Sequence, residues 1–167
     1  LGLCYGMQMA VVEYARNVLK LEGAHTTEID PDTKFPVIHL MPEQEKKMLA
    51  REYGGTMRLG AWDCKLKKDT LTYKLYKNSS HITHNSSLIS ERHRHRFEFN
   101  NDFLKSFLIN GFAISGTTPD GKLVEIIELK DHPFFIGTQF HPELKSRPLD
   151  PHPLYTGFIQ AASKIKA

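Results

Sequence analysis

Apolar residues recur along this chain at two spacings, one typical of helices and one typical of strands. From Met7 to Leu21 they lie three or four residues apart, which predicts a helix that Glu22-Gly23 ends. A similar stripe predicts a final helix over 154–165, and a short helix is expected over 103–109. Strands are predicted at 1–4, 35–40, 92–99 and 134–140, and the runs 112–117 and 123–129 predict a β-hairpin.

The remaining segments are expected to be short helices, turns and loops. Residues 43–52 predict a surface helix, 54–60 a glycine-flanked turn, 72–77 a strand or a short helix, and 78–90 a loop. Helices near both ends, with strands between them, indicate an α/β fold: an open sheet with flanking helices and an antiparallel hairpin extension.

The strand expected at 92–99 has two contrasting faces. Alternation predicts that positions 92, 94, 96 and 98, three arginines and a glutamate, share one face, and that the histidines and phenylalanines at 93, 95, 97 and 99 share the other. The arginines would bind a small carboxylate or phosphate, or line a solvated face paired with acids; nucleic acid is not expected, because glutamates bracket the run.

Composition places the chain among ordinary globular proteins. It has 167 residues, 40% of them hydrophobic, and a net charge of +3 with mixed signs, which fits one domain over 1–167. No apolar run approaches the roughly 18 residues of a membrane-spanning helix. Two cysteines are too few for a disulfide scaffold, which favours a reducing, cytoplasmic setting. Because the first residue is Leu1, we expect the chain to be a fragment.

The first candidate for chemistry is the segment Gly2-Leu3-Cys4-Tyr5-Gly6, which has the form of a nucleophile elbow. Such a turn places the Cys4 side chain at a helix N-terminus, where partial positive charge favours the thiolate. The Tyr5 amide would point toward an oxyanion. The same pattern also fits a small buried cysteine in an ordinary strand-turn-helix.

The second candidate is His141-Pro142-Glu143, which follows the strand predicted at 134–140. A histidine at a strand end can meet a nucleophile on a neighbouring strand, and Glu143 is close enough to fix its tautomer. An exposed loop histidine is the plain alternative, but the elbow and His141 occur in the order that a Cys-His-Glu triad needs.

Other polar residues carry weaker signals. His93 and His95, with His81 and His84, have no cysteine or carboxylate at matching spacing, and nearby arginines repel cations, so no metal is expected. Cys64 lacks an elbow and is interpreted as a structural or surface thiol. Glu125 and Glu128 are interpreted as structural.

Several segments together resemble a known family. The segments 2–8 and 139–143 resemble the class I (triad) glutamine amidotransferases, and 54–60, 91–98 and 124–128 are similar to the glutaminase domains of CTP synthases of eukaryotic type. The resemblance implies that Cys4 attacks the side-chain amide of glutamine, His141 protonates the departing ammonia, and Glu143 orients His141. Water then hydrolyses a γ-glutamyl thioester, and a synthetase domain uses the ammonia to convert UTP into CTP.

The same resemblance implies roles for further residues. Arg96 is expected to bind the α-carboxylate of glutamine, Glu28 its α-amino group, and Gln8 and Phe97 to shape the pocket. Arg58 is placed in a segment linked to activation by GTP. The domain itself is expected to need no cofactor, whereas the whole enzyme would use ATP, Mg²⁺ and GTP and form a homotetramer.

Two departures from the family pattern are visible. Position 5 is Tyr where the family commonly has Leu. This difference matters little, because the expected oxyanion donor is the backbone amide of residue 5 and not its side chain. The glycine loop that supplies the second oxyanion donor, the first strands and the synthetase domain are not in these residues. Alternatives that remain open are another triad amidotransferase, a γ-glutamyl hydrolase, a catalytically silent binding module of the same fold, and an RNA-binding domain.

Overall fold

The computed structural model describes residues 1–40, 57–82 and 86–164. Strand β1 spans Gly2–Leu3, β2 His25–Thr26, β3 Pro36–Leu40, β4 Arg58–Leu66, β5 Leu88–His95, β6 Phe97–Phe99, β7 Phe112–Thr117, β8 Val124–Leu129 and β9 Ile136–Thr138. Helix α1 spans Tyr5–Asn17, α3 Leu71–Lys77, α4 Leu104–Ile109 and α5 Pro153–Ala162, with short 3₁₀ turns η2 at Asn101–Phe103 and η3 at Pro142–Leu144. The surface helix predicted at 43–52 lies outside the described residues.

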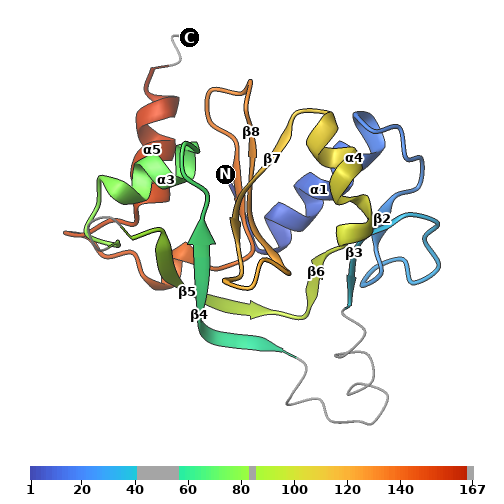
Figure 1. Ribbon diagram of the computed structural model, residues 1–167, viewed down its shortest axis with the longest axis horizontal. Coiled ribbons are helices and arrows are strands. Elements are labelled where there is room, and N and C mark those ends of the chain that lie inside the picture. The colour runs from blue at the N-terminus through green and yellow to red at the C-terminus, as the bar shows by residue number, and fades with distance from the viewer. Residues whose placement is uncertain (41–56, 83–85, 165–167) are drawn as a thin grey trace.

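The strands form a sheet of six in the order β1-β9-β8-β7-β4-β5 and a smaller sheet in the order β2-β3-β6. Helices α1 and α4 lie on one side of the large sheet, together with the small sheet, and α3 and α5 lie on the other (Figure 1). β1 and β9 are parallel, whereas β7, β8 and β9 pair antiparallel. This arrangement confirms the predicted α/β fold with its antiparallel hairpin.

Each face of the large sheet has its own apolar core. Neighbouring residues of β8 show this: Ile127 packs with Met7 and Val11 of α1, while Ile126 belongs to the cluster of Tyr76 and Leu154 on the other face. Side chains alternate across a strand, so one short run of isoleucines holds both layers together. Among the described residues, no helix is long and apolar enough to cross a membrane.

The local predictions differ from the structure mainly in the middle of the chain. Part of the turn predicted at 54–60 is the start of β4. The middle of β4 is mostly exposed, so its sequence lacks the apolar alternation that would predict a strand. The single strand predicted at 92–99 is two strands, because the chain leaves the large sheet at Arg96 and β6 pairs with β3. Residues 72–77 are helical, and the final helix starts at Pro153 rather than Leu154.

The break at Arg96 changes which residues share a face. Arg92 and Arg94 lie on one exposed face, as alternation predicted, but Glu98 is buried rather than on their side. Glu128 is also buried, where its carboxylate accepts hydrogen bonds from the first two amides of α3. This supports the structural role predicted for Glu128. Cys64 is fully buried, so of its two predicted settings the structural one is correct.

Candidate active site

The two candidate catalytic segments leave neighbouring parallel strands at the same edge. Leu3 of β1 lies opposite Thr138 of β9, and the Cys4 amide donates to the Thr138 carbonyl at 2.6 Å. Parallel strands bring their carboxyl ends together, so the chain emerges at Cys4 and, three residues beyond β9, at His141. The pairing that brings the two segments together is long-range in sequence, 135 residues between Leu3 and Thr138.

The elbow has the backbone geometry that its glycine pattern predicts. Cys4 has φ 49° and ψ −105°, a conformation that side-chain-bearing residues rarely adopt. A Cβ at Gly2 would lie 2.9 Å from the backbone of Gly6, so position 2 must be glycine, whereas a Cβ at Gly6 would meet nothing within 4 Å. Helix α1 starts at Tyr5, which places the Cys4 thiol at its N-terminus.

The thiol is not pre-ionised to the extent that the sequence predicted. Burial raises the pKa of Cys4, and the charge of Glu143 adds to that rise, while hydrogen bonds from the Tyr5 amide and the Gln139 side chain lower it. The net pKa of Cys4 lies above that of an ordinary thiol, so the expected thiolate preference is wrong for the isolated site. Nucleophilic attack by this thiol would need a base to take its proton.

His141 has the properties of that base. Its Nδ1 lies 2.6 Å from Oε1 of Glu143, and a carboxylate only accepts, so Nδ1 carries the proton and Nε2 has the free lone pair. Nε2 is buried and has no hydrogen-bond partner among the described residues. The His141 amide donates to the carbonyl of Arg92 at 2.8 Å, which holds this turn against β5.

A cavity of about 220 Å³ opens beside the sulfur. It is lined by Cys4, Tyr5, Gln8, Glu28, Met57, Arg94, His95, Arg96 and Phe97. The four residues that the resemblance assigned to glutamine, Gln8, Glu28, Arg96 and Phe97, therefore lie around one hollow with Cys4. Glu28 is exposed and Arg96 half-buried, so the site offers an anion and a cation to a small zwitterion.

A larger cavity of about 600 Å³ lies elsewhere, between the β-hairpin and α4. It is bordered by Leu66, Leu104, Ile114 and Val124 among others, and by no histidine or cysteine. Its size does not make it the site of chemistry, because it holds no nucleophile-base pair.

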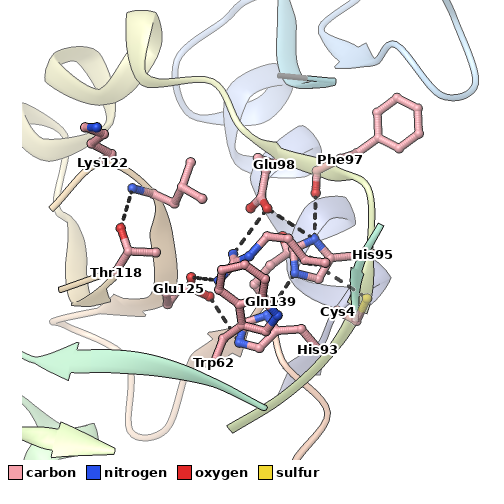
Figure 2. Close-up of polar contacts among 12 residues, drawn as sticks. Cys4, Trp62, His93, His95, Phe97, Glu98, Thr118, Lys122, Glu125 and Gln139 are labelled. Atoms are coloured by element: carbon pink, nitrogen blue, oxygen red, sulfur yellow. Dashed lines mark hydrogen bonds and ion pairs between the residues drawn. The ribbon is translucent and has the colours of Figure 1, made fainter. Parts of the chain in front are cut away.

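Beneath the small cavity lies a cluster of buried polar side chains that sequence patterns did not predict (Figure 2). We call it the buried ionic cluster; its members are Arg58, His93, His95, Glu98 and Glu125. Arg58 binds Glu98 at 3.2 Å and Glu125 at 2.7 Å, and His93 Nδ1 lies 2.9 Å from His95 Nε2. Only tertiary pairing of β4, β5, β6 and β8 brings these residues together.

Burial controls the protonation of this cluster. It lowers the pKa of His93 to about 2 and that of His95 to about 3, with Arg58 adding to both shifts. Burial also raises the pKa of Glu98 to about 8; the charge of Glu125 adds to this rise, and Arg58 opposes it. The histidines are thus neutral, and His93 Nδ1 pairs with His95 Nε2.

Arg58 has a different setting from the one that the resemblance implied. Its side chain is 5% exposed and its guanidinium is used by Glu98, Glu125 and the face of Trp62. In this structure it supports the interior behind the cavity. A contact between Arg58 and GTP stays a prediction.

One further group could hold a metal ion. Among the described residues, His81, Glu91 and His152 have ligand atoms within 4.8 Å of one another. His152 Nδ1 accepts from the Leu154 amide, so the proton sits on Nε2, which faces Glu91 at 3.2 Å. With Lys145 also 3.7 Å from Glu91, this group is better explained as a hydrogen-bonded support for β5 and α5 than as a metal site.

Comparison with known proteins agrees with this geometry. The family model described as glutamine amidotransferase class-I matches residues 1–161. CTP synthase of Picosynechococcus sp. is 58% identical over 167 residues, which is all of this chain and 28% of that protein. CTP synthase of Bacillus subtilis is 54% identical over 162 residues, 97% of this chain and 28% of that protein.

A solved structure is similar as well. The Trypanosoma brucei CTPS glutaminase domain with bound acivicin has a TM-score of 0.86 and 34% identity, covering 99% of this chain and 60% of that one. The bacterial relatives are thus more similar than this trypanosomal domain, against the expected eukaryotic type. The chain spans less than a third of the length of the curated relatives that it matches. Because the family match covers 161 of the 167 residues and the fold agrees with it, the chain belongs to the class-I glutamine amidotransferase family.

Proposed function

We propose that this chain hydrolyses glutamine to glutamate and ammonia with Cys4 as nucleophile, His141 as general base and acid, and Glu143 as its partner. One observation carries the proposal: the Cys4 elbow and the His141–Glu143 pair leave adjacent parallel strands at one edge, beside a cavity of about 220 Å³. The family match supports the chemistry, because its members act on glutamine amides.

The reaction follows from the arrangement of these groups. His141 Nε2 takes the thiol proton, and the sulfur attacks the carboxamide carbon of glutamine. The Tyr5 amide donates to the oxygen that becomes negative, and His141 returns the proton to the departing ammonia. Water, deprotonated by the same nitrogen, then releases glutamate from the thioester.

Binding of glutamine uses the cavity wall. We propose that Arg96 holds the α-carboxylate and Glu28 the α-amino group, and that Gln8 and Phe97 shape the pocket around the side chain. A charged pair at fixed separation selects an amino acid over a simple amide, because losing either charge leaves the other unpaired in the bound state.

The relatives' names suggest where the ammonia goes. We propose that this chain is the glutaminase part of a CTP synthase, a ligase that aminates UTP with ATP and Mg²⁺, responds to GTP through the Arg58 segment, and works as a cytoplasmic homotetramer. The same protein would contain the synthetase domain that accepts the ammonia. Another triad amidotransferase, a γ-glutamyl hydrolase or a silent binding module are the alternatives.

Labelling tests the nucleophile. Acivicin, a chlorinated glutamine mimic, should modify Cys4 and spare Cys64, as read by peptide mass, because Cys64 is fully buried. Cys4→Ser should abolish release of ammonia from glutamine, yet in a protein carrying the synthetase domain it should leave ammonia-dependent CTP formation intact. Labelling confined to Cys64 would overturn the assignment, and labelling without glutaminase activity would favour the silent module.

A further inference from the structure

Gln139 is a buried polar residue directly between β9 and His141. Its side chain has no exposed surface, and its backbone amide donates to the carbonyl of Glu125 at 2.8 Å. A fully buried amide needs partners for both its oxygen and its nitrogen. The position of those partners shows what the residue does.

Both partners belong to the catalytic cavity. The Gln139 nitrogen lies 3.8 Å from the Cys4 sulfur (Figure 2). The Gln139 oxygen lies 3.4 Å from the side-chain nitrogen of Gln8. Gln8 in turn donates to the carbonyl of Phe97 at 3.0 Å. A short chain of hydrogen bonds therefore runs from the backbone of β6 to the nucleophile.

The direction of this chain is fixed. The Phe97 carbonyl can only accept, so Gln8 must face it with its NH₂ group. That same NH₂ then faces Gln139, which must present its oxygen. The opposite orientation would place two NH₂ groups against each other and a carbonyl oxygen against the sulfur. Only the observed orientation leaves the Gln139 N–H pointing at Cys4.

We propose that Gln139 is a further catalytic residue, whose side-chain N–H holds the sulfur of Cys4 and stabilises the thiolate, in an orientation imposed by Gln8. A donor stabilises a negative sulfur more than a neutral thiol. It therefore opposes the effect of burial, which raises the pKa of Cys4. The Arg94 carbonyl, 4.0 Å from the sulfur, can accept only from the thiol form and gives the thiolate no help.

This role deepens the proposed function and rests on it only for the identity of the substrate. When His141 takes the thiol proton, the negative charge appears on sulfur, where the Tyr5 amide and Gln139 are the donors that lower the pKa. Gln139 thus makes the proton transfer less costly before glutamine is attacked.

Thiol reactivity tests the proposal without using glutamine. In the full chain, the rate of Cys4 alkylation by iodoacetamide is measured against pH by peptide mass for Gln139→Leu and Gln139→Glu. Loss of one donor to a charged group should lower the Cys4 rate at pH 7 about tenfold, with the same plateau at high pH. Gln139→Glu keeps the shape but adds negative charge, so its shift should be larger.

Two controls accompany these variants. Gln160→Leu makes the same chemical change at an exposed position of α5 and should leave the profile unchanged. Cys64 reports folding in each sample, because it becomes reactive only when the core opens. Unshifted profiles in both Gln139 variants, with Cys64 still protected, would overturn the proposal.

If the Gln139 variants unfold, NMR of the unsubstituted chain tests whether Gln139 donates to the Cys4 sulfur. The side-chain amide resonance of Gln139 should move as Cys4 titrates and should lose that movement in Cys4→Ser; absence of movement would overturn the proposal. A shifted alkylation profile in a chain that releases no ammonia from glutamine would keep this role for Gln139 and reject the proposed function.

Discussion

The histidines of this chain occupy two contrasting settings. His141 lies at a strand end with a side chain 23% exposed, bonded to Glu143 through one nitrogen while the other has no partner among the described residues. His93 and His95 are buried in the ionic cluster, next to each other and to Glu125 and Glu98. Catalysis needs a nitrogen that can gain and lose a proton, whereas burial keeps a histidine neutral. The first setting fits the catalytic role that we propose for His141, and the second fits a role in stabilising the fold.

Replacing His141 tests the catalytic side of this contrast most strongly. His141→Ala should lower kcat for glutamine hydrolysis by about as much as loss of Cys4, because residues of a triad act as a unit. The free energy of unfolding should change little, since His141 is partly exposed. Glu143→Gln should be milder, because an amide oxygen can still hold the ring. Kinetics and urea unfolding of both variants check this, and full activity in His141→Ala would refute the triad.

Replacing Arg58 tests the structural side. Arg58→Met leaves the buried Glu125 carboxylate without its cation and removes the hydrogen bond that Glu98 accepts, which should lower the free energy of unfolding by about 3–5 kcal/mol. Arg92→Met, on an exposed face of β5, should change it by no more than about 0.5 kcal/mol.

Adding Glu98→Gln and Glu125→Gln to Arg58→Met should recover part of the stability, because no buried charge then remains at these positions. Urea unfolding without any nucleotide keeps this measurement separate from GTP activation. An Arg58→Met chain as stable as the unsubstituted one would show that the cluster does not hold the interior together.

Replacing Arg96 tests whether glutamine binding can be weakened without the loss of catalysis expected at His141 or the loss of stability expected at Arg58. Arg96→Ala should raise KM for glutamine about ten- to a hundredfold and lower kcat less, because a charge-assisted hydrogen bond contributes roughly 1.5–3 kcal/mol to binding. Arg92→Ala is the matched control, since Arg92 does not line the cavity. An unchanged KM would move the carboxylate site elsewhere, for instance to backbone amides.

The pH dependence of stability gives the smallest expected effect. His93 has a folded pKa of about 2, so below pH 6.5 the unfolded chain gains a proton there that the folded chain does not. This term lowers the free energy of unfolding as the pH falls, by at most about 1.4 kcal/mol per pH unit. His93→Gln removes the term, so between pH 6.5 and about 5 the variant should lose less stability than the unsubstituted chain.

The protonation of Glu98 changes the stability with pH in the opposite direction to that of His93, so the experiment must remove the Glu98 contribution. Its pKa is raised to about 8, so the folded chain holds the extra proton and stability from this group falls as the pH rises toward that value. Comparing His93→Gln with the unsubstituted chain by urea unfolding at each pH removes the Glu98 contribution to first order. Parallel curves for the two proteins would show that His93 is protonated in the folded state.

The sequence by itself determined the parts of the fold that depend on local pattern. The helix after the elbow, the hairpin of β7 and β8 and the helix α5 follow from periodicity and turn residues. The hairpin and α5 are present close to their predicted bounds, whereas α1 ends at Asn17, before the predicted end at Leu21. Gly2, Cys4 and the pair His141 and Glu143 could be singled out because an elbow and a two-residue spacing are local signals.

Only the tertiary structure decided what depends on contacts between distant segments. β4 was missed because its pairing with β5 and β7, rather than its own pattern, makes it a strand. The break at Arg96 carries Glu98 into the interior beside Arg58, forty residues away in the chain, and reverses the face that alternation had assigned to it. Gln139 belongs to a segment that contributed to the family resemblance, but no local pattern indicated the role that we propose for it, because that role depends on the exact approach of Gln8 and Cys4. Local patterns fix which residues can form an element, but burial and hydrogen-bond partners are set by long-range packing, and these decide which polar groups are free to react.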